Sequence, residues 1–264
     1  MFPGGCFLRD TRFRVAPSIG VVAINEDNAH LTIDSLMTQA DRAMYEAKKT
    51  NQCYYLYNHV LEELVERESL IKQTLISSLQ GDGFQLNYMP IVCSRDKKLR
   101  GFEVLLRCPE LTTFGIGPQE FIPFAERASI IKEIDMWVIG QAFKEIKSIQ
   151  ELGHSNLLFS INISSLELMS FDFPDKVKTL LNHYELEANK IEFEITETAF
   201  APDDSRDLEV LFALKQLGFR LALDDFGTGF TSFNQLIRYP FDKLKIDKTF
   251  VDQILHDNPS KKRC

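Results

Sequence analysis

Polar side chains recur beside the apolar runs in the second half of the chain. The segment ALDDFGTGF places Asp224 and Asp225 between an apolar run and a glycine-rich turn. Glu103, Asn162 and Glu194 lie at corresponding places in other apolar runs. Carboxylate and amide oxygens are ligands of Mg²⁺ and Mn²⁺, and a divalent cation offsets the desolvation of buried carboxylates. The sequence therefore predicts a magnesium or manganese site formed by Glu103, Asn162, Glu194, Asp224 and Asp225.

Two adjacent aspartates can serve two ions, because one carboxylate can bridge them while the next holds the second ion. Two ions about 3.5–4 Å apart stabilise both the attacking and the leaving oxygen of a phosphodiester displacement. Lys245 adds a cation that can orient or polarise the attacking water, and Arg107 offers a planar fork for a phosphate. Taken singly, a lysine at a strand end is usually a solvated charge, and an Asp-Asp pair is often a helix cap. Their joint occurrence favours a phosphoryl-transfer site.

The tripeptide Asp225-Phe226-Gly227 is also the magnesium-binding signature of protein kinases. A kinase needs in addition a glycine-rich loop, a strand lysine of the V-A-I-K type and an H-R-D catalytic loop. The sequence contains none of these upstream of the tripeptide. A kinase is therefore excluded, and the strands around the tripeptide must explain its acids.

The chain from Gly81 onwards alternates between strand and helix patterns, as an α/β domain does. The predicted strands are FQLNYMPIV, LRGFEVLLRC, NLLFSINIS, KIEFEITET, FRLALDDFG and DKLKIDKTFV. Helical periodicity covers residues 118–153 and 206–218, and Gly153 and Gly218 occupy the position of a C-cap glycine. This order predicts a (β/α) barrel, in which chemistry gathers at the C-terminal ends of the strands.

Alternation along these strands indicates which side chains share a face. Glu192 and Glu194 lie on one face of their strand, and Lys243 and Lys245 lie on one face of theirs. Layers of Val, Ile and Leu fill a purely structural barrel interior. Polar residues on the inward face instead indicate a functional site.

The first 80 residues follow a different pattern. Residues 14–24 read as a strand, and an amphipathic helix with Asp34 or Ser35 as its N-cap follows. The run CYYLYN reads as a second short strand, so this region amounts to at most half a domain. A polar helix then runs through NHVLEELVERESLIKQTLISSLQ. It is read as a connector, because a coiled coil would need at least about four clean heptads.

Composition excludes several classes of protein. The chain has 264 residues, 44% of them apolar and 26% charged, as in an ordinary soluble globular protein. A net charge of -8 argues against a DNA- or RNA-binding protein, and no apolar run approaches the roughly 20 residues of a membrane span. The 5 cysteines include no C-x-x-C pair, so neither a disulfide framework nor a zinc site is expected. We expect a cytoplasmic protein with no membrane segment and no nucleic-acid partner.

Six motifs in the second half resemble those of the EAL domain family, cyclic di-GMP phosphodiesterases with a TIM-like barrel. EVLLR resembles the E-A-L-x-R signature, PQEFIPFAE the P-x-x-F-I-P-x-A-E helix start, and INIS the N-x-S strand end. EITE resembles E-L-T-E, DDFGTGFTS the D-D-F-G-x-G loop, and LKIDKTFV the K-x-D strand. They occur in the family's order between about Gly83 and Val251. The implied fold is α/β, a TIM-like (β/α) barrel of EAL type.

The resemblance implies a site with two divalent ions, Mg²⁺ or Mn²⁺. Glu103, Asn162, Glu194 and Asp224 would hold the first ion, and Asp224 and Asp225 would serve the second. Cyclic di-GMP would be the ligand and substrate, opened to linear pGpG by a two-metal mechanism.

Further matched positions imply catalytic and substrate-binding roles. Lys245 would act on the catalytic water. Arg107 would contact a phosphate of the substrate, with Asp225 beside it, and Glu197 would anchor the D-D-F-G loop. The catalytic set implied by the resemblance is Lys245, Glu103, Asp224, Asp225 and Glu197.

The front of the chain resembles another family. APSIGVVAI and ADRAMYEAKKTNQCYYLYN are similar to the last part of a GGDEF (diguanylate cyclase) domain, a common companion of EAL domains. The G-G-D-E-F loop itself is missing from the sequence, so no cyclase activity is expected. The expected organisation is a partial α+β GGDEF remnant in residues 1–58, a helical connector in 59–80 and an EAL domain in 81–264. The expected assembly is a homodimer through the EAL barrel or the connector helix.

The EAL resemblance ends after the K-x-D strand. The family continues with an A-E-G-V-E strand and a Q-G strand that closes the barrel, and neither has a counterpart before Cys264. We therefore expect a barrel truncated before its last strands, and weak hydrolysis by this chain. Three interpretations stay open: a cyclic di-GMP phosphodiesterase, a binding or regulatory module that does not cleave cyclic di-GMP, and a fragment with neither activity.

Overall fold

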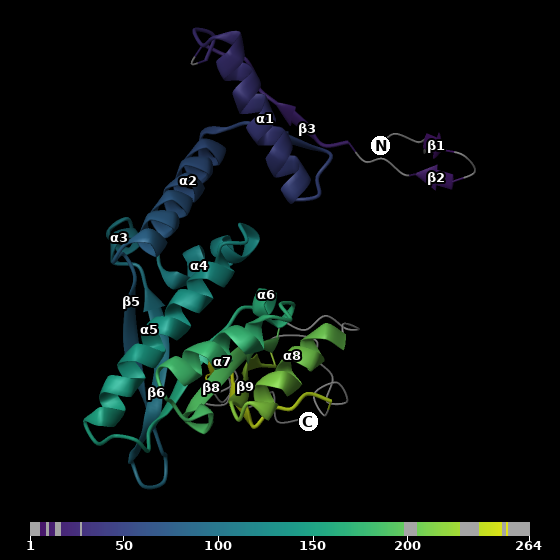
Figure 1. Cartoon of the computed structure of the whole chain (residues 1–264). Helices are drawn as coiled ribbons and strands as arrows, with labels where there is room; N and C mark the ends of the chain where they lie inside the picture. The colour runs from purple at the N-terminus through teal and green to yellow at the C-terminus, as the bar shows by residue number, and fades with distance from the viewer. Residues whose placement is uncertain are drawn as a thin grey trace, which may run out of the picture. The chain divides into compact units, whose positions relative to one another are not determined.

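The computed structural model describes residues 6–8, 11–13, 17–26, 28–197, 205–227, 238–249 and 252. The chain forms two compact units, Met1–Ile71 and Lys72–Cys264. The division falls within helix α2 (His59–Gln80), which the sequence predicts as a connector. Figure 1 shows the helices and strands of both units. Within the described ranges, no helix combines the length and the apolar character needed to cross a membrane.

The unit Lys72–Cys264 is built on a six-stranded sheet in the order β10-β9-β8-β7-β6-β5. Its strands are β5 (Gln85–Val92), β6 (Leu99–Arg107), β7 (Leu158–Asn162), β8 (Ile191–Thr196), β9 (Arg220–Phe226) and β10 (Lys243–Ile246). Neighbouring strands from β6 to β10 are parallel. A mostly parallel sheet with helices between its strands fits the predicted TIM-like α/β fold.

Strand β10 is shorter than the sequence predicts. The predicted strand extends to Val251, whereas β10 ends at Ile246 and helical geometry begins at Lys248. Asp247 explains this end, because its carboxylate accepts a hydrogen bond from the backbone N–H of Thr249 at 2.8 Å, as an N-cap residue does. The rest of the predicted strand lies outside the described residues.

Strands β5 and β6 form an antiparallel hairpin, whereas a uniform (β/α) barrel has parallel neighbours. Residues 93–98 connect the two strands, and Lys97 in this connection has a φ of 56°. A connection this short returns the chain directly beside β5, since a parallel neighbour needs a crossover of roughly a dozen or more residues. The pairing places Met89 opposite Glu103, the first of the predicted metal ligands.

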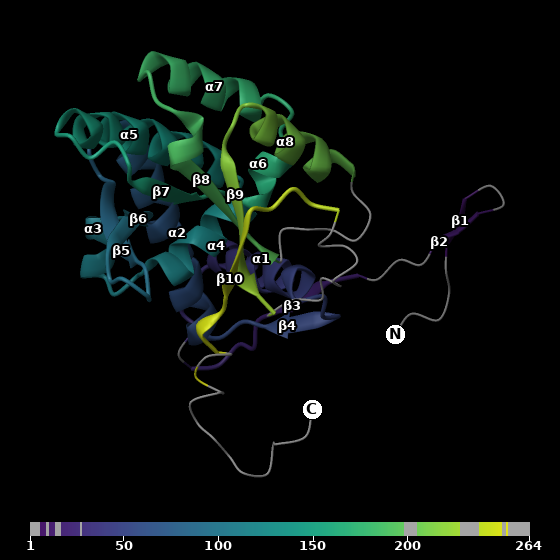
Figure 2. The same ribbon diagram turned by 90° about the horizontal axis from the view of Figure 1, so that it is seen from below.

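Helices lie between the strands of this sheet in the sequence. They are α3 (Pro109–Thr113), α4 (Pro118–Arg127), α5 (Ile131–Glu151), α6 (Ser165–Leu168), α7 (Phe173–His183), the 3₁₀ helix η1 (Ala188–Lys190) and α8 (Ser205–Gln216). Of these, α5, α8 and η1 contact the sheet, and α7 packs between α5 and α8 (Figures 1 and 2). The helical pattern predicted over residues 118–153 is broken into α4 and α5 around Ser129, whose φ is 59°.

Two glycines follow helices at the predicted positions. Gly153 comes after α5 and Gly218 after α8, and each has a φ of 96°. Glycine is favoured at such a position because it lacks the Cβ that strains the left-handed region. The two predicted C-cap glycines are therefore confirmed.

Aromatic and aliphatic side chains fill the helix-facing side of the sheet. Phe159 and Phe193 are fully buried, and the ring of Phe193 lies 5.0 Å from that of Phe219 and 6.0 Å from that of Phe173 on α7. Burial of each such side chain contributes about 1.5–3 kcal/mol. Successive side chains of a strand point to opposite faces, so Glu194, next to Phe193, points to the other side. Packing of this apolar layer therefore keeps together the strands whose opposite face carries Glu194 and the other polar side chains.

The unit Met1–Ile71 contains helix α1 (Ile33–Lys49) and two small sheets. Strands β1 (Cys6–Leu8) and β2 (Thr11–Phe13) are antiparallel, and strands β3 (Ile19–Val21) and β4 (Tyr54–Leu56) are parallel. Helix α1 packs closely on β3, because a Cβ at Gly20 would lie 1.8 Å from the carbonyl oxygen of Ala40. Strand β3 is shorter than the strand predicted over residues 14–24, of which 14–16 lie outside the described residues.

The N-cap of α1 is Thr32, so the prediction of Asp34 or Ser35 was wrong. The Thr32 Oγ1 accepts a hydrogen bond from the backbone N–H of Ser35 at 3.2 Å. Asp34 lies in the first turn instead, where a carboxylate favours the positive end of the helix dipole. Thr, Asp and Ser are all good N-cap residues, so composition could not distinguish them.

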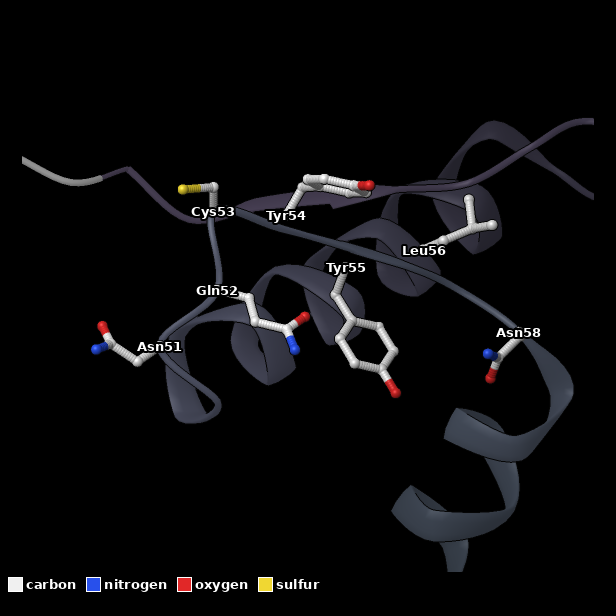
Figure 3. A pocket seen from close by; sticks show the side chains of 7 residues that line it. All are labelled: Asn51, Gln52, Cys53, Tyr54, Tyr55, Leu56 and Asn58. Carbon is white, nitrogen blue, oxygen red and sulfur yellow. The ribbon is translucent and has the colours of Figure 1, made fainter. Parts of the chain in front are cut away.

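A pocket lies beside β4 (Figure 3). Residues 51–56 and Asn58 line it, and none of them carries a carboxylate or an amine. These amide, aromatic, thiol and aliphatic side chains offer hydrogen bonds but no cluster of charged ligands. The predicted chemistry lies elsewhere, in the unit Lys72–Cys264.

Gly101 sets the close approach of β6 to β7, the strands that carry Glu103 and Asn162. A Cβ at Gly101 would lie 1.9 Å from the carbonyl oxygen of Leu158, a backbone atom that cannot rotate away. We expect Gly101→Ala to lower the free energy of unfolding by about 2 kcal/mol or more, measured by urea denaturation followed by circular dichroism.

Gly140→Ala is the matched control, because a Cβ at this position of α5 meets no atom within 4 Å. Alanine is the better helix former by roughly 0.5–1 kcal/mol, so this variant should be at least as stable as the parent chain. Equal stability of the two alanine variants would contradict the close approach of the strands.

Candidate metal and catalytic site

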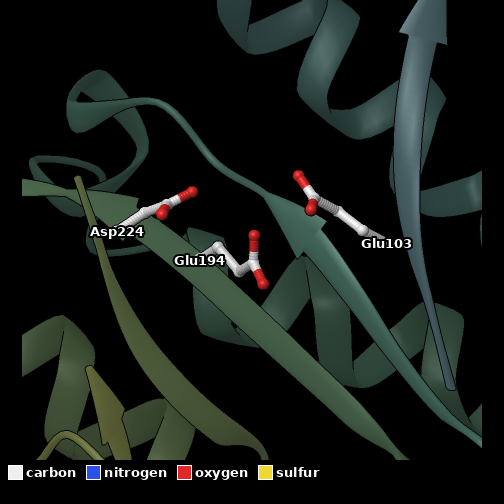
Figure 4. Close-up of side chains that lie close together, drawn as sticks. All are labelled: Glu103, Glu194 and Asp224. Atoms are coloured by element: carbon white, nitrogen blue, oxygen red, sulfur yellow. The ribbon is translucent and has the colours of Figure 1, made fainter. Parts of the chain in front are cut away.

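Three carboxylates from three strands of the sheet converge (Figure 4). Glu103 from β6, Glu194 from β8 and Asp224 from β9 each offer an oxygen, and these oxygens all lie within 4.8 Å of one another. Their side chains are 12%, 0% and 18% exposed, in that order. Parallel pairing from β6 to β9 brings the three side chains together on one face of the sheet. We call these three residues the carboxylate cluster.

Lys245 of β10 reaches all three members of the carboxylate cluster. Its Nζ lies 2.7 Å from Asp224 Oδ2 and 3.5 Å from Glu103 Oε2, and it also donates a hydrogen bond to Glu194 Oε2. Burial by itself lowers the pKa of Lys245, but the hydrogen bonds to Asp224 and Glu194 outweigh burial and raise the pKa. The amine therefore stays protonated at neutral pH, and one ammonium faces three carboxyl groups.

Glu194 is the most deeply buried member of the cluster. Burial raises the pKa of Glu194, and the hydrogen bond from Lys245 opposes this rise. Oxygen Oε2 is bonded to Lys245, but Oε1 has no hydrogen-bond partner within the part of the chain that the structure describes. Buried carboxylate oxygens normally find a partner, so an unpartnered one beside two further carboxylates fits a divalent cation. The donor set is suited to a hard cation with oxygen ligands.

Two other predicted ligands lie beside the cluster. Asn162 at the end of β7 donates a hydrogen bond from Nδ2 to Glu103 Oε1 at 3.3 Å. Asp225 is exposed and has a φ of 53°, and its backbone N–H donates to Asp224 Oδ1 at 2.9 Å. Burial, and next the charge of Asp224, raise the pKa of the Asp225 carboxyl. Of the two adjacent aspartates, Asp224 belongs to the cluster and Asp225 lies next to it.

Glu197 and Arg107 lie outside the cluster. Glu197 is 3% exposed, and its Oε2 accepts a hydrogen bond from the backbone N–H of Gly227 at 2.7 Å. This bond ties the end of β8 to the turn after β9, while the rest of the predicted loop, residues 228–232, lies outside the described residues. Arg107 Nη1 donates to the carbonyl oxygen of Leu106 at 2.8 Å, and no contact with the cluster occurs among the described atoms.

A second polar row lies beneath the carboxylate cluster. Glu192 precedes Glu194 by two residues along β8 and is 2% exposed. Its Oε1 accepts hydrogen bonds from Ser160 Oγ at 2.8 Å and from Lys243 Nζ at 2.7 Å. Alternation along the strands predicts that these side chains face inward, but it does not predict which of them pair.

A protein-family model described as "EAL domain" matches residues 72–264. The chain belongs to the EAL domain family. The match covers the whole unit that carries the carboxylate cluster and Lys245. The EAL resemblance noted in the sequence is therefore confirmed.

Curated EAL relatives are similar over nearly the whole chain. The biofilm architecture maintenance protein MbaA of Vibrio cholerae is 38% identical over 250 residues, which cover 94% of this chain and 31% of that protein. The bifunctional diguanylate cyclase/cyclic di-GMP phosphodiesterase MucR of Pseudomonas aeruginosa is 30% identical over 246 residues, 93% of this chain and 36% of that protein. The chain thus spans about a third of the length of these relatives.

Solved EAL structures share the fold. The PaMucR phosphodiesterase in complex with c-di-GMP is 30% identical, with a TM-score of 0.65 over 71% of this chain and 76% of that one. The EAL enzyme Bd1971, in its form bound to cAMP and cyclic-di-GMP, is 28% identical, with a TM-score of 0.69 over 88% of this chain and 61% of that one. These similarities support the TIM-like EAL architecture of the sheet and its helices.

Sequence reasoning missed Asp135, which holds the loop after β7 of the EAL domain. Asp135 lies on α5 and is 7% exposed, and its Oδ2 accepts a hydrogen bond from the backbone N–H of Ser164 at 3.0 Å. Ser164 follows Asn162 by two residues, so this bond holds the turn that comes directly after Asn162. The signal available in the sequence was an acidic residue among the otherwise apolar buried positions of α5.

Asp135 should make the stability of the EAL domain depend on pH. Burial raises its pKa to about 7, bonds with Ser164 oppose the rise, and the charges of Glu167 and Glu126 add to it. The folded state therefore keeps a proton that the unfolded state loses near pH 3.9, and stability falls as the pH rises from roughly 4 to 7. We expect Asp135→Asn to reduce the loss of unfolding free energy between about pH 5 and pH 7 by roughly 2 kcal/mol.

Urea denaturation across this pH range measures the effect. Asp175→Asn is the matched control, because Asp175 is an exposed carboxylate on α7, and it should keep the pH dependence of the parent chain. A pH dependence that is unchanged in Asp135→Asn would show that another group takes up the proton.

Proposed function

We propose that this chain carries the phosphodiesterase domain of a bacterial cyclic di-GMP signalling protein, and that it opens cyclic di-GMP to linear pGpG. The observation that carries the proposal is the carboxylate cluster, all three members of which form ion pairs with Lys245. Such a set of oxygens suits two-metal hydrolysis of a phosphodiester. The relatives support the substrate, because MucR and NbdA of Pseudomonas aeruginosa are both named as cyclic di-GMP phosphodiesterases.

The proposed cofactor is a pair of Mg²⁺ or Mn²⁺ ions. Glu103, Glu194, Asp224 and the amide oxygen of Asn162 would hold the first ion, and Asp224 and Asp225 would serve the second. When bound, such ions supply Lewis-acid chemistry that activates water and offsets the charge of the phosphate. The unpartnered Glu194 Oε1 and the excess of carboxylates over cations in the cluster support this assignment.

Lys245 is the proposed group that orients the attacking water. Its ammonium keeps its proton because of its ion pairs, so it acts as a hydrogen-bond donor and a local positive charge rather than as a base. Arg107 is the proposed phosphate contact, since a guanidinium has five N–H donors and the bond to Leu106 uses one of them. Glu197 would hold the turn after β9, and with it Asp225, through its bond to Gly227.

For the front of the chain we propose a GGDEF remnant in residues 1–58, followed by a connector in residues 59–80 and the EAL domain in residues 81–264. The relatives support this organisation. The MbaA match covers 94% of the chain and so extends in front of the EAL match, and MucR is named as a diguanylate cyclase as well as a phosphodiesterase. The homodimer and the cytoplasmic location stay predictions.

A divalent ion should stabilise the EAL domain through the carboxylate cluster. At about a hundredfold excess over its dissociation constant, Mn²⁺ should raise the free energy of unfolding by about 2.7 kcal/mol relative to EDTA. Asp224→Asn should remove most of this gain, because it withdraws a charged ligand. The exposed Asp175→Asn should keep it. Equal stabilisation of Asp224→Asn and the parent chain would contradict the proposed ligands.

Hydrolysis is tested by incubating the chain with cyclic di-GMP and Mn²⁺ and separating pGpG by chromatography. Lys245→Met should lower kcat by at least about a hundredfold, because it removes a group that acts on the water in the transition state. Lys147→Met, which removes a peripheral pair with Glu185, should leave kcat unchanged. Equal turnover by both variants would make the assignment of Lys245 wrong.

Calorimetry with cyclic di-GMP separates the remaining interpretations. Binding together with hydrolysis supports the phosphodiesterase. Binding without any product by the parent chain supports a binding or regulatory module instead. The proposed ligand is overturned if the parent chain neither binds nor cleaves it.

A further inference from the structure

Strand β10 has a weakly specified register. It comprises 4 residues, Lys243–Ile246, and among the described residues it pairs with β9 alone. The pairing is irregular between Leu244 and Ile246, which interrupts the ladder. Because the side-chain period of a strand is two, a slip by one residue would turn both lysines of β10 away from the polar interior. Backbone pairing therefore needs a further contact to hold the strand in place.

Two ion pairs supply contacts between β10 and β8. Lys243 Nζ lies 2.7 Å from Glu192 Oε1, and Lys245 donates to Glu194. The two lysines are two residues apart on β10, and the two glutamates are two residues apart on β8. The two ion pairs therefore lie one after the other along the strands, and we call each pair a rung. Both rungs span β9, where the fully buried Ala222 lies in register with Glu194 on one side and Lys243 on the other. The short side chain of Ala222 leaves room for the lysine stems.

The rung formed by Lys243 has a rigid anchor. The Glu192 side chain is 2% exposed, and its Oε1 also accepts a hydrogen bond from Ser160 Oγ on β7 at 2.8 Å. Glu192 is therefore held by a third strand before Lys243 reaches it. The carboxylate of this pair is buried, whereas the Lys243 side chain is 36% exposed. An ion pair to a buried carboxylate can specify one arrangement even where its net contribution to stability is small.

We infer that Lys243 is a positioning residue, which through Glu192 fixes the register of β10 and so places Lys245 at the carboxylate cluster. The importance of Lys245 for turnover rests on the proposed function, whereas the effect on register does not. Among the described contacts, Lys243 touches no member of the cluster. Its effect on the reaction must therefore pass through Lys245.

Hydrogen–deuterium exchange of the whole chain tests the register. Lys243→Met keeps most of the apolar stem and removes the ammonium, and we expect the β10 amides to exchange at least about fivefold faster. Lys176→Met is the matched control, because Lys176 and Asp172 form an ion pair with the same separation of 2.7 Å on α7. It should leave β10 exchange unchanged. Unchanged β10 exchange in Lys243→Met overturns the inference.

Kinetics with cyclic di-GMP and Mn²⁺ test whether Lys243 acts through Lys245. Lys243→Met should lower kcat at least about tenfold and keep KM and the Mn²⁺ Kd within about threefold, since a misplaced group costs rate rather than binding. Lys243→Arg, which keeps the charge, should restore most of the rate. In a Lys245→Met background, Lys243→Met should lower kcat less than about twofold, because the two substitutions remove one shared effect. Additive losses would show a merely structural role and overturn the inference.

A double variant tests the inference if Lys243→Met does not fold because it leaves the Glu192 carboxylate without its cation. Glu192→Gln combined with Lys243→Met removes both charges together, and the same faster exchange and lower kcat are expected. Absence of hydrolysis by the parent chain would count against the proposed function, and β10 exchange would then decide the register by itself. Hydrolysis by the parent with unaltered β10 exchange in both variants would overturn the inference and leave the proposed function standing.

Discussion

Buried negative charge is the constraint on which this EAL domain depends. Glu103, Glu194 and Asp224 hold their oxygens within 4.8 Å of one another, and none of the three side chains is more than 18% exposed. Desolvation and mutual repulsion would drive such groups apart or protonate them if no cation faced them. Lys245 supplies one positive charge, and the apolar layer on the other side of the sheet keeps the strands together. The negative charge of the three carboxylates costs free energy to bury, and the same charge favours the binding of cations at this site.

The elements around the site differ in how firmly they are held. Strands β6 to β9 each have two neighbours in the described sheet, and α5 packs on β7 while α8 packs on β9. Strand β10, which carries Lys245, has one described neighbour and relies on side-chain contacts to the interior. The ligands of the proposed metal site thus lie on the rigid part of the sheet, and the cation that completes the site lies on the less constrained part.

Local sequence signals predicted elements wherever a single pattern bounded them. Gly153 and Gly218 were identifiable as C-caps because the left-handed backbone after a helix favours glycine. The N-cap of α1 was not identifiable, because Thr32 competes there with other capping residues nearby. The end of β10 was missed for a related reason, since the cap formed by Asp247 interrupts a run that still alternates like a strand. The antiparallel β5–β6 hairpin was not predicted, because the length of its connection rather than either strand pattern determines it.

By itself the sequence determined the chemical type of the site. Glu103, Glu194 and Asp224 were identifiable because strand alternation and their positions in apolar runs select them, and their oxygens select a hard cation. Only the tertiary structure decided which side chains meet. Asp224 rather than Asp225 enters the cluster, and the half-buried Lys243 pairs with Glu192 across an intervening strand. The reason is that sheet register and packing determine these contacts, and both join residues too distant in the sequence for any local pattern to relate them.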